Sequence, residues 1–125
     1  MILIWIAIGG AVGSVLRYLI YTTIDGIHTS SFPLGVLIVN VIGSFLIGYL
    51  TWIFTHQVHL SEEYRGAILI GLLGGFTTFS SFAYNNLDYF LSEQYLLMLF
   101  NIVLSVVLCI IAAGVGLILA KSLVN

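Results

Sequence analysis

Charged residues are scarce in this sequence. Only 6% of the 125 residues are Asp, Glu, Lys or Arg, and 61% are hydrophobic, whereas about 25% of the residues of a soluble domain are charged. Too few polar side chains are present to cover a water-exposed surface, so the composition predicts an integral membrane protein. The three Lys and Arg residues make no basic patch, which excludes nucleic acid as an expected partner.

The chain also has a single cysteine and a single proline. Cys109 lies inside a hydrophobic run, so an internal disulfide is excluded and a sulfur-ligated metal site is not expected. No nucleophile–base pair or pair of carboxylates points to an enzyme. The first residues lack the basic start and small-residue cleavage site of a secretory signal, so we expect the first hydrophobic segment to remain as a helix.

Hydrophobic runs occur four times, each reaching the length of about 20 residues that a helix needs to cross a bilayer. Ser31 with Pro33, Ser61 and Ser92 are typical of helix starts. What remains is too short for a soluble domain, so we predict one all-α domain, 1–125, with four transmembrane helices. The predicted spans are 2–24, 32–54, 62–90 and 93–120.

Membrane orientation depends on where Lys and Arg fall. Arg65 and Lys121 fall on the side of the N-terminus, and Arg17 falls toward the other side. Because this bias is small, we expect insertion in both orientations, so that two copies pair head to tail as an antiparallel dual-topology dimer.

Pairs of small residues four positions apart let helix backbones approach closely. They fit either a dimer surface or packing within one subunit. The pairs are Gly9 with Gly13, Gly71 with Gly75, and Ala112 with Gly116.

The third predicted span is too long for a straight crossing. Its helix signals run from Ser61 to Phe90, whereas about 20 residues cross a bilayer. A break near 74–78, at Gly74 and Gly75, would take up the excess, and interrupted helices of this kind mark ion sites in transporters. The alternative is a tilted, unbroken helix whose Ser and Thr hydroxyls bond to their own backbone.

The segment 74–82, GGFTTFSSF, mixes aromatic and hydroxyl side chains. Phe76, Phe79 and Phe82 recur every third residue, which predicts one helical face. Ring edges carry partial positive charge, so such a face next to hydroxyls fits a small anion that has lost its water. The alternative is a stripe that fills a core or faces lipid. The neighbouring hydroxyls belong to Thr77, Thr78, Ser80 and Ser81.

In this order and at these spacings, three segments resemble the Fluc (CrcB-type) fluoride channels: GGAVGSVLRY at 9–18, PLGVLIVNVIGSFLIG at 33–48 and GLLGGFTTFSSF at 71–82. The resemblance covers essentially the whole chain. It implies a dual-topology dimer with two anion pores and a central structural sodium ion. It also implies passive export of fluoride through the cell inner (plasma) membrane, which reduces fluoride toxicity in the cytoplasm.

Roles for single residues follow from the same resemblance. Gly74 and Thr77 correspond to residues whose backbone carbonyls hold the sodium ion, two from each subunit. Arg17 corresponds to an arginine at the end of the first helix that makes a vestibule electropositive; the alternative is that its side chain extends to the membrane interface. The anion pore is expected to include Asn40, Thr78, Phe79, Ser80, Ser81, Phe82, Asn101 and Ser105.

Several positions depart from the family pattern. Val36 and Asn85 stand where relatives commonly have threonine and glutamate. A track of hydroxyls along the last helix would continue at Cys109 and Ala113, and neither carries a hydroxyl. These departures leave open whether both pores of a homodimer conduct, and a heterodimer with a related chain is the alternative.

Two other classes of protein share some of these features. A small multidrug exporter also has four helices and dual topology, but it needs a carboxylate within the membrane to exchange protons. The first span has none, and Asp88 lies near a helix end. A non-transporting assembly subunit would explain the glycine-rich helices, but not the clustered Thr, Ser and Phe.

Overall fold

The computed structural model describes residues 1–124. Every regular element in that range is a helix. Four helical segments are long and apolar enough to cross a membrane: Ile2–Ile27, Leu34–His56, Glu62–Leu91 and Tyr95–Leu123. The all-α membrane class predicted from composition is confirmed.

The first, second and last crossings are continuous helices, and the third is built from shorter pieces. The continuous helices are α1 (Ile2–Ile27), α2 (Leu34–His56) and α6 (Tyr95–Leu123). The pieces of the third crossing are α3 (Glu62–Arg65), the π-helix η1 (Gly66–Leu72), α4 (Leu73–Phe76) and α5 (Phe79–Leu91).

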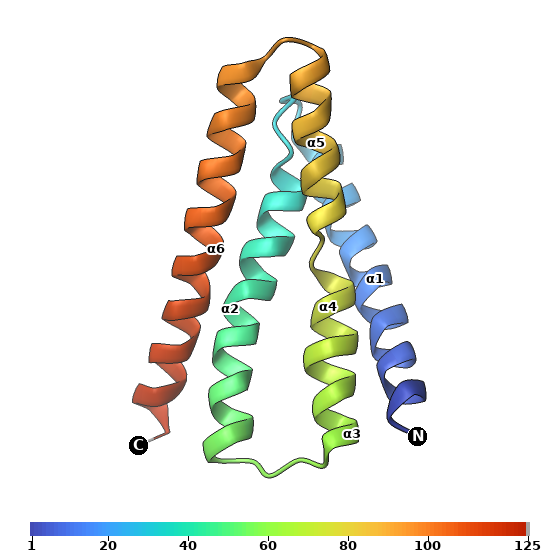
Figure 1. The fold of residues 1–125 in the computed structure, drawn as a ribbon, viewed down its shortest axis with the longest axis vertical. Coiled ribbons are helices and arrows are strands. Elements are labelled where there is room, and N and C mark those ends of the chain that lie inside the picture. Colours follow the sequence, from blue (N-terminus) through green and yellow to red (C-terminus); the bar gives the residue numbers. More distant parts are fainter. Residues whose placement is uncertain (125) are drawn as a thin grey trace.

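The helices associate as two pairs. α1 packs along η1 and α4, and α2 packs along α6. The two pairs lie close together at one end and diverge toward the end that carries both termini (Figure 1). α1 also contacts α2, but few contacts join α2 to α4, so space is left between α2 and the third crossing.

Close approach within one chain explains the predicted small-residue pairs. A Cβ on Gly9 or Gly13 would collide with the backbone of η1, and one on Gly71 or Gly75 would collide with the backbone of α1. Gly116 packs in the same way against a carbonyl of α2. These glycines therefore pack helices within one subunit, which is one of the two interpretations that the sequence left open.

The break in the third crossing is confirmed, and it lies at Thr77 and Thr78. Thr77 has ψ 157°, and Thr78 has φ −147° and ψ 116°, so both residues are extended. Gly74 and Gly75, at which the break was expected, are helical. Threonine is branched at Cβ and favours extended backbone; the two threonines therefore make the break, and Gly75 serves packing against α1.

Two of the predicted helix starts are wrong. Pro33, rather than Ser31, directly precedes the first turn of α2. Ser92 ends α5 by donating its hydroxyl to the Asp88 carbonyl at 2.7 Å, and Glu93 has a left-handed φ of 59°. A left-handed residue is typical of a helix end, so these two residues stop α5 before α6 begins.

Gly13→Ala is expected to lower the Tm of the purified protein, because the new Cβ would collide with the Leu72 carbonyl oxygen and lie 2.8 Å from Phe76 N. Overpacking of this kind costs roughly 1–3 kcal/mol. Gly26→Ala in the same helix is the control, since nothing lies within 4 Å of its added Cβ. Thermal unfolding in detergent compares them. Equal melting of both variants would contradict the close packing of α1 on the third crossing.

Candidate functional site

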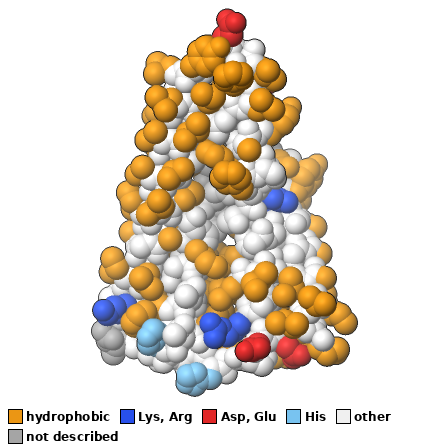
Figure 2. Space-filling view, in the orientation of Figure 1, with side chains coloured by type: hydrophobic (Ala, Val, Ile, Leu, Met, Phe, Trp, Pro, Cys, Tyr) orange, Lys and Arg blue, Asp and Glu red, His pale blue; other side chains and the backbone are white. Residues whose placement is uncertain are grey.

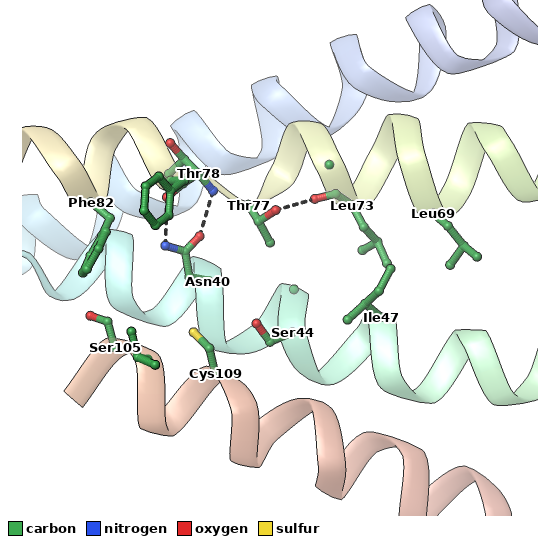
Figure 3. Close-up of a pocket in the computed structure, with 14 residues that line it drawn as sticks. Asn40, Ser44, Ile47, Leu69, Leu73, Thr77, Thr78, Phe82, Ser105 and Cys109 are labelled. Atoms are coloured by element: carbon green, nitrogen blue, oxygen red, sulfur yellow. Dashed lines mark hydrogen bonds between the residues drawn. The ribbon is translucent and has the colours of Figure 1, made fainter. Parts of the chain in front are cut away.

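Asn40 on α2 holds the helix break in place. Its Oδ1 accepts a hydrogen bond from Thr78 N at 2.7 Å, and its Nδ2 donates to Thr78 O at 3.0 Å (Figure 3). In a continuous helix Thr78 N–H would donate to the Gly74 carbonyl. The Asn40 side chain therefore satisfies both backbone groups of Thr78, and the Gly74 carbonyl loses its usual donor.

The two threonines of the break have opposite tasks. Thr77 closes α4: its Oγ1 donates to the Leu73 carbonyl at 2.9 Å. Thr78 opens α5: its Oγ1 accepts from Ser81 N at 3.1 Å, as an N-cap residue does. The Thr78 hydroxyl also donates to Ser81 Oγ at 3.1 Å and lies 3.2 Å from Ser80 Oγ. These bonds fix the direction in which α5 leaves the break.

A cavity of about 380 Å³ lies between the two helix pairs, beside the break. Figure 2 shows this face of the molecule hollowed near mid-height. Asn40 uses one N–H of Nδ2 on Thr78 and has two, so its second N–H remains available to the cavity that it lines. The polar lining residues are Asn40, Ser44, Thr77, Thr78 and Ser105, and the aromatic ones are Phe79 and Phe82.

Phe79 and Phe82 project from the first turn of α5 and line this cavity together. Their ring centroids are 5.4 Å apart and their planes make an angle of 48°. Phe79 is 79% exposed, so the cavity is open on its side, whereas Phe76 is only 6% exposed. The expectation that Phe76 shares their face is wrong, because the extended residues of the break turn the chain between α4 and α5.

A second cavity, of about 400 Å³, lies where α5 meets the end of α1 and the start of α2. Ser80 and Ser81 line it, rather than the first cavity. The Ser81 hydroxyl accepts from Thr78, so its own proton is free. Within residues 1–124, Asn85 Nδ2 is buried without a hydrogen-bond partner. Asp25, which accepts from Gly35 N at 3.3 Å, supplies a carboxylate to the same cavity.

Asn101 belongs to a buried hydrogen-bond chain between α5 and α6. It is 1% exposed; its Nδ2 donates to Asn86 Oδ1 at 3.0 Å, and its Oδ1 accepts from Ser105 Oγ at 3.3 Å. Asn86 Nδ2 donates in turn to the Phe82 carbonyl at 2.9 Å. Among the residues of the described chain that line the first cavity, Ser105 appears and Asn101 does not. Asn101 therefore acts on the backbone of Phe82 indirectly, through its hydrogen bond to Asn86.

Arg17 lies well inside α1 rather than at its end. Its Nη1 donates to the Thr77 carbonyl oxygen at 3.4 Å, in a partly buried contact. It lines neither of the two cavities that residues 1–124 form here. The guanidinium of Arg17 thus lies at the break. Neither of the two expected positions, a vestibule or the membrane interface, predicted this contact.

The positions that depart from the family pattern fall in different places. Cys109 lines the first cavity, and Val36 and Asn85 line the second. The Ala113 backbone instead packs against Gly48 of α2. Three of the four departures therefore change the chemistry of a cavity wall, and Ala113 serves helix packing.

Sequence reasoning missed two polar residues of this region. Ser44 lines the first cavity, and its spacing of four from Asn40 places both on one helix face; that spacing could have identified it. Asn86, next to Asn85 in the sequence, is the second. A buried asparagine within a membrane helix needs a partner, but the sequence does not show which residue supplies it; in the structure it is Asn101.

The chain has four helices that can span a membrane. Beside the interrupted third crossing lies a small cavity lined with hydrogen-bond donors. These features are typical of an integral membrane protein that conducts ions. A family model described as "CrcB-like protein, Camphor Resistance (CrcB)" matches residues 4–117. The chain belongs to this family, so the resemblance found in the sequence is confirmed.

Relatives of nearly full length are similar to this chain. It is 39% identical over 117 residues to "Fluoride-specific ion channel FluC" of Magnetococcus marinus, an overlap of 94% of this chain and 95% of that protein. It is 42% identical over 118 residues to the protein of the same name from Parabacteroides distasonis, with 94% and 91% of the two chains covered. The corresponding protein of Geobacter sulfurreducens is 39% identical over 118 residues, with 94% and 95% covered.

Asn40→Asp is expected to destabilise the protein. The carboxylate would still accept from Thr78 N, but it would face Thr78 O with a second acceptor where Nδ2 now donates. A buried acceptor left without a donor costs about 1–3 kcal/mol. Ser44→Ala, on the same helix and lining the same cavity, is the control. Denaturation midpoints in detergent measure the difference; a wild-type midpoint for Asn40→Asp would contradict the role of Asn40 at the break.

Proposed function

We propose that this chain is a fluoride-selective channel that lets fluoride leave the cell passively across the inner (plasma) membrane. The observation that carries the proposal is the donor-lined cavity at the helix break, in a chain whose nearly full-length relatives are named fluoride-specific ion channels. A channel needs a path and a selective site rather than a reactive group, and this cavity offers both.

Replacement of the water around the ion explains how such a site selects fluoride. Fluoride is small and strongly hydrated, so a narrow path must supply donors where water is lost. The second N–H of Asn40, the Ser44 hydroxyl and the ring edges of Phe79 and Phe82 can act as donors in the first cavity. Chloride is larger, so a path that narrows to the size of fluoride once a partner copy closes the cavity would exclude it.

Beyond the phenylalanines, the proposed path continues along α5. Ser80 and Ser81 line the second cavity, where the Ser81 proton and the unpartnered Asn85 Nδ2 are free to donate. Thr78 lies between the two cavities and orients these hydroxyls through its own. The Asp25 carboxylate also lines the second cavity and would repel an anion, so it would weaken fluoride binding in this part of the path.

A second, antiparallel copy of the chain would complete this path. Phe79 is 79% exposed and the first cavity is open beside it, so one subunit alone does not enclose an ion. We propose a dual-topology homodimer with two such paths. A heterodimer with a related chain is the second candidate, because Val36, Asn85 and Cys109 change the polarity of the cavity walls.

We further propose that a sodium ion is bound on the two-fold axis of this dimer by the carbonyl oxygens of Gly74 and Thr77. The residues fit such an ion. The Gly74 carbonyl has lost its usual donor to Asn40, and Gly74 lines the first cavity, with nothing within 4 Å of a Cβ added there. Carbonyl oxygens are ligands that hard cations prefer. Bound there, the ion would supply positive charge that balances carbonyls no lipid can satisfy.

Liposomes test the channel directly. The chain, expressed alone and reconstituted, is expected to release trapped fluoride when valinomycin and potassium dissipate the membrane potential, and to retain chloride. A fluoride electrode measures the initial rate. Flux by the chain alone supports the homodimer, and flux only after co-expression with a related chain supports the heterodimer. Proton-coupled movement of organic cations without fluoride release would contradict the proposal and indicate an exporter.

Phe79→Ile and Phe82→Ile are expected to slow fluoride efflux by about tenfold or more, which is about 1.4 kcal/mol in the barrier. Isoleucine keeps the apolar bulk and removes the polarised ring edge. Phe90→Ile is the control, because Phe90 lies on the same helix, is 53% exposed and pairs with Tyr95 instead. Wild-type rates in both test variants, with intact dimers, would mean that the rings only pack or face lipid.

A further inference from the structure

We infer that Arg17 sets the affinity of the helix break for a cation, because its guanidinium and the bound ion share the carbonyl oxygen of Thr77. The inference rests on the proposed sodium site and goes beyond it: it assigns to Arg17 a positioning role that regulates that site.

The contact itself is specific but loose. Arg17 Nη1 lies 3.4 Å from Thr77 O, whereas a hydrogen bond from a charged donor is normally about 2.7–2.9 Å long. Thr77 N and Thr77 Oγ1 both donate to the Leu73 carbonyl, at 3.0 and 2.9 Å. The carbonyl oxygen is therefore the one polar atom of Thr77 that is directed out of α4, and Arg17 is placed to use it.

A carbonyl oxygen has two lone pairs, so the guanidinium and a cation can both approach it. They repel each other, since two unit charges a few ångströms apart in a partly buried site change a binding constant by about tenfold or more. Each copy of a symmetric dimer would bring its own Arg17. The arginine therefore weakens cation binding without excluding it.

The same contact explains why a charge is kept at this depth, where arginine is costly. The Thr77 carbonyl has left the helix ladder, because Thr77 is extended with ψ 157°. Without a cation the carbonyl still needs a donor, and Arg17 supplies one. Arg17 thus donates to the Thr77 carbonyl and stabilises the break while the cation is absent. When the cation binds, the carbonyl oxygen is shared between the two.

Sodium titration of the purified dimer tests the inference without measuring transport. The Tm is recorded against sodium concentration at constant ionic strength, with N-methylglucamine as the replacement cation, to give an apparent Kd for sodium. Arg17→Gln removes the charge and leaves a shorter, neutral and therefore weaker donor. Arg17→Lys keeps the charge but lacks the planar guanidinium. We expect about tenfold tighter sodium binding for Arg17→Gln, a wild-type Kd for Arg17→Lys, and a lower Tm for Arg17→Gln in sodium-free buffer.

The outcomes separate the two proposals. No sodium-specific stabilisation of the wild-type dimer would overturn the sodium site and this inference with it. Sodium stabilisation with the same Kd in all three proteins, or with weaker binding in Arg17→Gln, would overturn only the role of Arg17. If Arg17→Gln yields no dimer, Arg17→Met carries the same expectation. If neither Arg17→Gln nor Arg17→Met folds in saturating sodium, the role of Arg17 is also overturned. If Arg17 only competes with sodium for the Thr77 carbonyl, its removal should leave the sodium site intact.

Discussion

A backbone N–H or C=O inside a bilayer has no water to bond, so an interrupted helix survives there only if the protein supplies the missing partners. Thr78 is extended at this position, and the carboxamide of Asn40 donates to its carbonyl and accepts from its N–H. Because these bonds hold the start of α5, they also place the two phenylalanines that follow it. The first cavity, the open Gly74 carbonyl and the contact of Arg17 with Thr77 all depend on the same two hydrogen bonds.

Glycine contributes by removing side chains rather than by bending the chain. α1 approaches the third crossing so closely that Gly13 and Gly75 each touch the backbone of the opposite helix. α2 is held in the same way against α6 through Gly48 and Gly116. Since each pair is tight and α2 makes few contacts with the third crossing, the space between these two remains open for the polar side chains of α2 and the break.

Composition and segment length were enough to predict four spanning helices and a break in the third, because a bilayer imposes both the apolar runs and their length. The position of the break was assigned to Gly74 and Gly75, since a glycine that packs and a glycine that bends look alike in a sequence. The periodicity of Phe76, Phe79 and Phe82 assumed one continuous helix, and two extended residues rotate Phe76 into the core. Neither η1 nor the pairing of Asn86 with Asn101 could be predicted, because a π-helix has no distinct composition and a side-chain pair depends on how helices meet.

The exposed ring of Phe79 affects how the protein would assemble. In water a phenylalanine with 79% of its surface uncovered would favour association strongly, but lipid tails solvate the ring as well as another helix does. A single copy therefore has no apolar penalty for remaining alone, and any pairing must come from shape and from polar groups such as the open Gly74 carbonyl. Assembly is then governed by the number of copies per unit of membrane area, so that sparse expression or added lipid dilutes the protein in two dimensions.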